Sequence, residues 1–199
     1  MVHLKTFIFF LAIIFAPANQ QSGIKVGDLA PNFNLKNVDG KMVSLDSSKD
    51  AKGYIVVFTC NTCPYSVMYE QRIIELHQKY APIGYSVIAI QPNSPQVSVG
   101  DSYAKMKEKS NTEGFSFPYV IDNEAQETTM AYGATNTPQV YVLNKEGSAY
   151  KVAYIGAIDN NSRNPEAATK RYVELAIDEL LAGIPVSTKN TKAIGCTIK

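Results

Sequence analysis

The chain is poor in metal-binding residues. Its 199 residues include only three cysteines and two histidines, and His3 falls in a segment that we expect to be removed. Zinc usually takes four cysteine or histidine ligands, and after that removal only His77 remains beside the cysteines. We therefore expect no metal cofactor, although two thiolates alone can bind a soft ion such as Cu(I).

The chain also lacks an excess of positive or negative charge. The 19 basic and 18 acidic residues nearly cancel, and no run of like charges is long enough to predict nucleic acid or an anionic membrane as a partner. No internal repeat, low-complexity segment or linker interrupts residues 25–184, so we predict one domain there. With 45% hydrophobic residues, a chain of this length can bury a substantial core.

A continuous apolar run occurs at the N-terminus. Lys5 precedes ten apolar residues, 7–16, and Ala16-Pro17-Ala18 is a small-x-small cleavage sequence, which together make the three regions of a secretory signal peptide. Ten apolar residues are too few to span a bilayer core of about 30 Å. No cysteine lies near the cleavage sequence, which argues against a lipoprotein. We predict a signal peptide at 1–18, a polar leader at 19–24, and an exported protein, periplasmic or secreted, without a stable membrane anchor.

Two of the cysteines form a C-x-x-C sequence. Cys60-Asn61-Thr62-Cys63 follows an apolar strand pattern at 54–59 and precedes a helical pattern with Pro64 in its first turn. At a helix N-terminus, unpaired N–H groups and the helix dipole favour a thiolate over a thiol. A disulfide across so short a loop constrains the unfolded chain little. We predict a redox-active pair in which Cys60, exposed at the helix tip, attacks, and the more buried Cys63 resolves the mixed disulfide.

Strand and helix patterns alternate along the chain. Two extended segments flank the turn Asp39-Gly40, which suits a hairpin. The strand at 85–91 is continuously apolar over 87–90, as a strand buried on both faces requires. Further strands are expected at 118–121, 139–143 and 150–155, and helices at 63–80, 101–109 and 124–132. This order predicts an α/β fold with a central mixed sheet and helices on both faces.

A last helix has clear start and stop signals. Asn164 can cap it, Pro165 can occupy its first position, and Gly183 can end it. Its apolar face is expected to contain Val173, Ile177, Leu180 and Leu181. Residues 185–199 then form a polar tail that carries Cys196.

Thr137-Pro138 opens the strand at 139–143. A proline at the first position of a strand needs no ladder N–H, so alone it marks only where the strand starts. Together with the strand, C-x-x-C and helix upstream, it looks like the cis-proline loop that faces the redox cysteines in thioredoxin folds.

These features resemble the redoxin part of the thioredoxin superfamily, which holds the peroxiredoxins (the AhpC/TSA group) and the TlpA-like thiol reductases. The chain is most similar to peroxiredoxin-like thioredoxin family proteins with C-N-x-C-P-Y after the strand. The matching segments are 27–33, 38–41, the strand into 60–63, 117–119, 131–134, 137–141 and 195–199. The resemblance implies a thioredoxin fold with an N-terminal β-hairpin and a redoxin-type insertion before the cis-proline strand. It also implies that the redox-active disulfide is the only cofactor and that Thr137-Pro138 orients the substrate backbone.

The chain departs from the family pattern at three points. Typical peroxiredoxins place the attacking cysteine directly after the pattern P-x-x-x-T/S-x-x. Here the Pro and Thr positions hold Gly53 and Val57 before Cys60, and Val56 and Cys60 before Cys63. Thr59 stands where typical thioredoxins have Trp, and residues 54–59 contain no acid, whereas thioredoxins carry a buried Asp on this strand. The proton that Cys63 exchanges must then come from solvent or from a residue that the sequence does not identify.

Three functions follow from these observations. The leading one is an exported thiol-disulfide oxidoreductase that acts on a protein disulfide substrate or a reductase partner. The alternative is a thiol peroxidase, an antioxidant in which a peroxide oxidises Cys60 to a sulfenic acid that Cys63 or Cys196 captures. The third is a non-enzymatic copper chaperone.

Cys196 is the odd thiol of a chain that we expect to be exported. Because an odd thiol in an oxidising compartment suggests a reactive group, Cys196 is a candidate third redox thiol if the tail folds back onto Cys60 or Cys63. The alternative is a thiol that packs locally or stays free.

Overall fold

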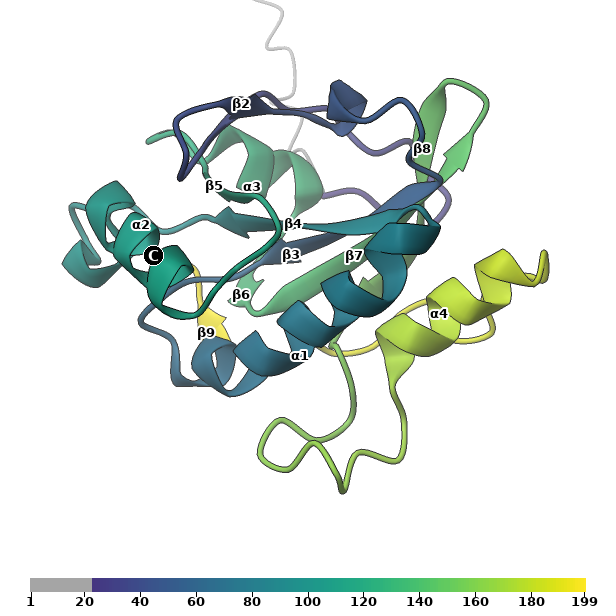
Figure 1. The fold of residues 1–199 in the computed structure, drawn as a ribbon. Helices are drawn as coiled ribbons and strands as arrows, with labels where there is room; N and C mark the ends of the chain where they lie inside the picture. Colours follow the sequence, from purple (N-terminus) through teal and green to yellow (C-terminus); the bar gives the residue numbers. More distant parts are fainter. Residues whose placement is uncertain (1–22) are drawn as a thin grey trace, which may run out of the picture.

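Within residues 23–199, which the computed structural model describes, a seven-stranded mixed sheet forms the centre of the molecule (Figure 1). The predicted signal peptide and most of the leader lie outside the described residues. Among the helices of residues 23–199, none combines the length and apolar composition needed to cross a membrane.

The elements follow the order predicted from the sequence. The strands are β1 (Leu35–Asn37), β2 (Met42–Val43), β3 (Gly53–Phe58), β4 (Tyr85–Gln91), β5 (Tyr119–Ile121), β6 (Asn136–Thr137), β7 (Gln139–Glu146), β8 (Ala149–Gly156) and β9 (Cys196–Thr197). The helices are α1 (Pro64–Tyr80), α2 (Tyr103–Thr112), α3 (Glu127–Tyr132) and α4 (Tyr172–Leu181), with 3-10 turns η1 (Leu45–Ser47), η2 (Ala81–Ile83) and η3 (Val99–Asp101).

The sheet has the order β2-β1-β5-β4-β3-β7-β8. β3 runs parallel to β4 and β4 parallel to β5, while β7 is antiparallel to both β3 and β8. β1 and β2 form the predicted hairpin around Asp39-Gly40, and α2, β5 and α3 are inserted between β4 and β7. The predicted thioredoxin-type architecture is confirmed.

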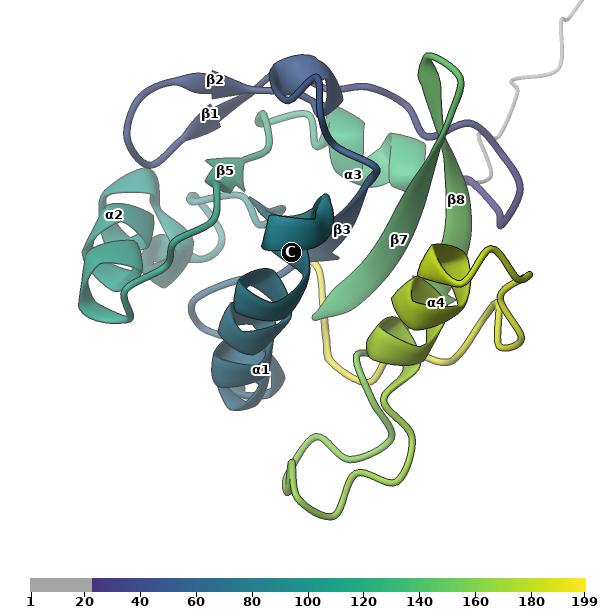
Figure 2. The ribbon, with the colours of Figure 1, turned by 45° about the vertical axis from the view of Figure 1, so that its right-hand side comes forward.

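Helices cover both faces of this sheet (Figures 1 and 2). α1 and α4 pack on one face, against alternate residues of the central strands such as Ile55, Val87 and Val142. α3 and the N-terminal segments cover the opposite face, where Val56 and Ile88 point. Every residue of β3 is buried, as its continuous apolar pattern predicts, and each such Val or Ile contributes roughly 1.5–3 kcal/mol through burial.

α1 begins and ends where the sequence indicates. Cys63 is its N-cap and Pro64 its first residue, where the missing proline N–H would have no helical partner. Helical geometry continues to Tyr80, and η2 and Gly84, at a φ of 103°, then turn the chain into β4.

The start of the last helix was predicted wrongly. α4 begins at Tyr172 rather than near Asn164. The Asn164 side chain does accept from backbone N–H groups, those of Glu166 and Ala167, but it caps only a turn. The Asn160 N–H donates to the Lys170 carbonyl, and the Asn160 side chain accepts from the Lys170 N–H and donates to Thr169. These contacts hold residues 159–171 in a non-helical path.

The predicted apolar face of that helix is partly correct. Val173 and Ile177 are buried in the core, and Leu180 is partly buried against it. Leu181 lies in the last turn and is 39% exposed, because α4 ends there and its last turn projects past the sheet.

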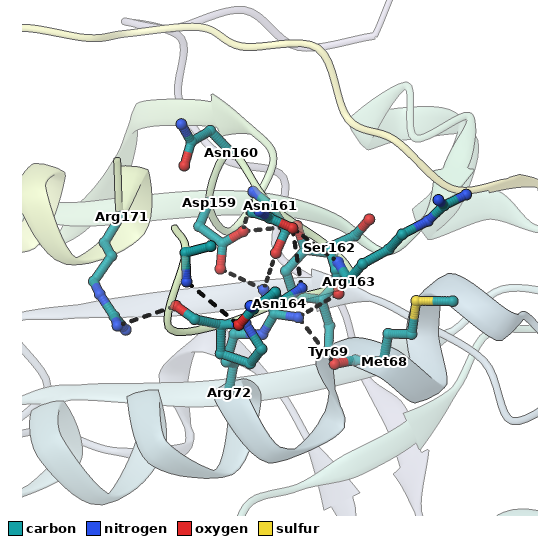
Figure 3. Close-up of polar contacts among 12 residues, drawn as sticks. Met68, Tyr69, Arg72, Asp159, Asn160, Asn161, Ser162, Arg163, Asn164 and Arg171 are labelled. Atoms are coloured by element: carbon teal, nitrogen blue, oxygen red, sulfur yellow. Dashed lines mark hydrogen bonds and ion pairs between the residues drawn. The ribbon is translucent and has the colours of Figure 1, made fainter. Parts of the chain in front are cut away.

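A buried ion pair fastens the loop at 159–171 to α1 (Figure 3). The Arg72 guanidinium donates to Asp159 Oδ2 at 2.5 Å and to the carbonyl oxygens of Asn161 and Ser162 at 2.7 and 2.6 Å. Tyr69 donates its hydroxyl to Asp159 Oδ1 at 3.0 Å, and its ring lies 3.9 Å from the guanidinium carbon. Arg72 and Asp159 are each 4% exposed, so each charge depends on the other for compensation.

Replacement of Arg72 by Met should destabilise the protein strongly. It leaves the Asp159 carboxylate buried without its cation, a change that costs about 3–5 kcal/mol in folded proteins. Lys79→Met, which removes an ion pair with Glu174 whose lysine is 51% exposed, should cost at most about 1 kcal/mol. Urea unfolding of the two variants checks this difference, and equal losses would contradict the role given to Arg72.

Candidate functional site

The register between β3 and β7 brings the C-x-x-C sequence to the proline loop. Phe58 pairs with Gln139, so the residues after β3 meet the residues before β7. Cys60 Sγ lies 3.3 Å from Thr137 Oγ1, and Cys63 Sγ lies 3.0 Å from the Thr137 carbonyl oxygen. The Thr137–Pro138 peptide bond is cis, as the sequence predicts.

Cys60 is less accessible than the sequence predicted. It is 3% exposed and Cys63 is 2% exposed, and both are free thiols. Cys63, rather than Cys60, is the N-cap of α1. The predictions that Cys60 is exposed and that it sits at the helix N-terminus are therefore wrong, because the helix starts one residue after Cys63 and other segments cover the preceding turn.

The thiolate is favoured at Cys63. Burial opposes its ionisation, but hydrogen bonds from the Cys196 side chain, the Ser66 backbone, the Cys196 backbone and the Thr137 side chain outweigh burial and lower the Cys63 pKa. Ser66 belongs to the first turn of α1, where the N–H groups lack helical acceptors. The helix N-terminus therefore acts on Cys63.

The C-terminal segment returns to the two cysteines. β9 pairs antiparallel with β6, with Cys196 opposite Thr137, and Ile198 donates its N–H to the Thr135 carbonyl at 3.1 Å. Cys60, Cys63 and Cys196 together line one groove of about 360 Å³. Burial, together with the hydrogen bond to Cys63 and the charges of Cys63 and Cys60, raises the pKa of Cys196 to about 11. The tail therefore folds back, and Cys196 stands beside Cys63 as a protonated thiol.

A buried carboxylate holds the two residues between the cysteines. Asp101 Oδ1 accepts the backbone N–H groups of Asn61 at 2.8 Å and Thr62 at 3.1 Å, and Oδ2 accepts the Thr62 hydroxyl at 2.9 Å. Asn93 and Ser98 also donate to Oδ2, and Asp101 is fully buried. Because the Asp101 oxygens accept both N–H groups, the conformation of the C-x-x-C turn depends on this side chain.

The close approach of η3 to this turn requires a glycine. A Cβ on Gly100 would lie 2.5 Å from the Thr62 side chain. The Gly100 carbonyl also accepts from the Asn61 side chain at 2.9 Å. Residues 100–101 therefore support the C-x-x-C turn from outside the sheet.

A second acid, Glu70 on α1, lines a pocket together with Cys60. This pocket, which Tyr119 also lines, is a small cavity of about 10 Å³, roughly the space needed for one water molecule. Burial raises the Glu70 pKa, although Lys109 lies 2.6 Å away and opposes that shift. A carboxylate with a raised pKa is a better proton acceptor, and this one shares a cavity with a thiol.

Metal ligands do not gather in the described part of the chain. Within residues 23–199, no three His, Cys, Asp or Glu side chains are arranged to hold a metal ion. His77 accepts the Val87 N–H at 3.2 Å and packs edge-on against Phe117, so its contacts are those of a core residue.

Comparison with known proteins assigns the chain to a family. The AhpC/TSA family model matches residues 26–154, which include both cysteines of the pair and the proline loop. The chain belongs to the AhpC/TSA family. It is a thiol-dependent oxidoreductase of the thioredoxin superfamily, as its resemblance to the redoxin group predicts.

Proteins similar to this chain include thiol-disulfide oxidoreductases. It is 26% identical over 136 residues to the thiol-disulfide oxidoreductase ResA of Geobacillus thermodenitrificans, which covers 67% of this chain and 71% of that protein. It is 27% identical over 135 residues to ResA of Bacillus subtilis, with 66% and 69% covered. These matches support a thiol-disulfide oxidoreductase role.

Solved structures resemble it over a larger part of the chain. An uncharacterised conserved protein of Geobacillus kaustophilus is 35% identical, with a TM-score of 0.80 over 87% of this chain and 91% of that one. A hypothetical protein of Sinorhizobium meliloti is 29% identical, with a TM-score of 0.81 over 89% and 96%. The likeness therefore extends beyond the segment that the family model matches.

Sequence reasoning missed two acids of this site. Asp101 was interpreted as the start of a helix, but α2 begins at Tyr103 and Asp101 turns toward the C-x-x-C loop. Glu70 lies in a helix with no distinguishing pattern around it. The signal that could have drawn attention to Asp101 is its neighbour Gly100, because a Gly-Asp pair before a helix often marks a tight loop.

Replacement of Asp101 by Asn should loosen the turn between the cysteines. One carboxylate oxygen becomes an NH₂ group that cannot accept, so at least one charge-assisted hydrogen bond, each contributing about 1.5–3 kcal/mol, is lost. We expect faster hydrogen exchange at the Asn61 and Thr62 amides, measured by NMR, together with lower stability in urea.

The matched control is Ser98→Ala. Ser98 donates to the same carboxylate, at Oδ2, but does not hold the backbone of the turn. It should lower stability slightly and leave amide exchange at Asn61 and Thr62 as in the parent. Unchanged exchange in Asp101→Asn would contradict the assigned role.

Proposed function

We propose that this chain is an exported thiol-disulfide oxidoreductase that exchanges protein disulfides with the Cys60–Cys63 pair. The observation that carries the proposal is the position of both sulfurs at Thr137, one at its hydroxyl and one at its carbonyl oxygen. The ResA relatives, which are named thiol-disulfide oxidoreductases, support the same reaction. The disulfide itself is the only cofactor that this reaction requires.

In the first step Cys60 attacks the substrate disulfide. Glu70, which shares a cavity with Cys60, takes the thiol proton, and the Cys60 sulfur bonds to one substrate sulfur. The other substrate sulfur leaves as a thiolate and is protonated from solvent. Thr137 steadies the attacking sulfur through its hydroxyl, at 3.3 Å.

In the second step Cys63 releases the substrate. Its pKa is lowered despite burial, so it forms the thiolate that the attack on Cys60 requires more readily than an ordinary cysteine does. The Cys63 sulfur bonds to Cys60, and the second substrate sulfur leaves. The pair ends as a disulfide, the substrate as a dithiol, and a reductase partner must return two electrons.

Export rests on the N-terminal pattern. Residues 1–18 have the charged, apolar and cleavage regions of a secretory signal peptide. An exported location suits the chemistry, because disulfides form and persist outside the cytosol.

A thiol peroxidase is the second candidate, because the family includes peroxide reductants by the resemblance noted above. In that reaction Cys60 becomes a sulfenic acid and Cys63 condenses with it, releasing water. The sequence lacks the P-x-x-x-T/S-x-x pattern of typical peroxiredoxins before both Cys60 and Cys63. This lack favours disulfide exchange.

Cysteine variants should separate the two roles in the pair. With a disulfide-bonded peptide, Cys63→Ser should accumulate a mixed disulfide on Cys60 because the resolving thiolate is gone. Cys60→Ser should lose exchange with the peptide, and intact mass spectrometry of acid-quenched samples follows both. A stable adduct on Cys63 in the Cys60 variant, with none on Cys60 in the Cys63 variant, would reverse the assignment.

The rate with peroxide should distinguish the two functions. Stopped-flow oxidation of the reduced protein by one equivalent of hydrogen peroxide should be no faster than that of a free thiol. Rapid oxidation that Cys60→Ser abolishes would instead establish a peroxidase.

Replacement of Glu70 by Gln should slow attack by Cys60. We expect a loss of about 10–100-fold at neutral pH. In the parent, the rate should rise with pH as Glu70 deprotonates, and this limb of the pH–rate profile should be missing in the variant. Lys109→Gln breaks the ion pair but keeps the carboxylate, so it should retain the limb. A parent-like profile in Glu70→Gln would remove Glu70 from the mechanism.

A further inference from the structure

The chain's own C-terminal strand occupies the backbone edge beside the proline loop. β9 pairs with β6 in antiparallel register, at Asn136–Thr197 and Thr137–Cys196, and Figure 1 shows it beside β6 near the start of α1. A substrate peptide oriented by Thr137 would need this same edge. Cys196 therefore stands where the cysteine of a paired peptide would stand, next to the redox pair.

The strand is held in place by contacts on both sides of Cys196. A Cβ on Gly195 would lie 2.2 Å from the Thr137 carbonyl oxygen, so only glycine permits this approach. Beyond Cys196, Ile198 bonds to Thr135, and Lys199 donates its N–H to Asn93 Oδ1 at 2.8 Å. The Lys199 oxygen accepts from the Ser94 N–H at 3.0 Å and from Gln126 at 2.9 Å. The position of Cys196 is thus specified by the fold.

The three thiols differ in their access to a protein partner. Cys60 and Cys63 are buried, whereas Cys196 is partly exposed. Any partner sulfur, of a substrate disulfide or of a reducing dithiol, must come within bonding distance of the sulfur with which it reacts. The substrate must enter the groove to reach Cys60, whereas a reductant can meet a transferred disulfide at Cys196. Among the three, Cys196 offers the most accessible sulfur.

We propose that Cys196 is a third redox thiol that takes the disulfide over from the Cys60–Cys63 pair and presents it to a protein dithiol reductant. This inference rests on the proposed function, because it needs the pair to become oxidised. It adds a resident relay between the buried pair and the partner.

The relay step is an exchange without net oxidation. The Cys196 thiolate attacks Cys63 Sγ, the Cys63–Cys196 bond forms, and the Cys60–Cys63 bond breaks. Cys60 leaves as a thiolate and receives a proton, so the proton lost from Cys196 is balanced. A partner dithiol then attacks the Cys196 sulfur, resolves its own mixed disulfide, and leaves three thiols in this chain and one disulfide in the partner.

The electrostatics of the groove favour this order of events. In the reduced protein, burial and then the hydrogen bond and charge of Cys63 raise the Cys196 pKa, so Cys196 remains a thiol. When Cys60 and Cys63 form a disulfide, the hydrogen bond and the charge of Cys63 no longer act on Cys196, while its burial remains. The Cys196 pKa should then fall below its value in the reduced protein, which favours attack by Cys196 once the pair is oxidised.

The first test uses Cys60→Ser, which retains Cys63 and Cys196. Mild oxidation with diamide, alkylation of free thiols and peptide mapping should find an intramolecular Cys63–Cys196 disulfide in most chains. The same mapping on the parent, oxidised by a disulfide-bonded peptide, should find this bond beside Cys60–Cys63. Two free thiols in the oxidised Cys60 variant, or only intermolecular bridges, would overturn the proposal.

The second test compares two reductants. Reduced thioredoxin, a protein dithiol, should reduce oxidised Cys196→Ala several-fold more slowly than the parent, whereas dithiothreitol should reduce both at the same rate. A structural defect would alter both rates. The exposed tail variant Lys192→Ala should match the parent with both reductants.

The outcomes separate this inference from the proposed function. If Cys196→Ala is reduced at the parent's rate by both reductants, the relay proposal is refuted. Disulfide exchange by the Cys60–Cys63 pair would still stand. A parent protein that fails to exchange with the peptide disulfide would end the proposed function itself.

Discussion

The antiparallel register of β3 and β7 is the constraint on which the site depends. The pairing of Phe58 with Gln139 determines where β3 ends and the C-x-x-C turn begins. It also determines where the proline loop ends and β7 begins. A slip of one residue would turn every side chain of β3 to the other face, and its continuous apolar pattern would tolerate that poorly because each face packs against different helices. Core packing thus places two sulfurs within about 3.3 Å of the atoms of one threonine.

Around that placement, the two thiols have different surroundings. Cys63 caps α1 and receives hydrogen bonds that lower its pKa, while Cys60 faces Glu70 and Tyr119 across a cavity with room for about one water molecule. The attacking thiol needs a base and the resolving thiol needs to ionise readily, and these two environments supply one requirement each. Asp101 completes the arrangement, because it accepts the N–H groups of the residues between the cysteines.

The C-terminal tail occupies the strand edge beside the proline loop. In a thiol oxidoreductase an open edge beside the proline loop would receive a substrate chain, but here the edge is paired with β9. The redox pair is buried, and the strand that pairs with this edge carries the partly exposed Cys196. Substrate entry and disulfide transfer are therefore coupled to one segment that the central sheet does not contain.

Local patterns in the sequence determined much of this protein. The apolar strands, the C-x-x-C at a strand–helix junction and Pro64 at the first helical position all depend on neighbours within a few residues, and all agree with the structure. The cis bond at Thr137–Pro138 was expected from the resemblance to thioredoxin folds and is also present. Tertiary structure decided what depends on distant segments. It placed Asp101 under the C-x-x-C turn and Glu70 beside Cys60, it delayed α4 to Tyr172 because Arg72 and loop contacts hold residues 159–171, and it brought Cys196 to Cys63. No periodicity or spacing encodes these contacts, because each joins side chains that only the folded sheet brings together.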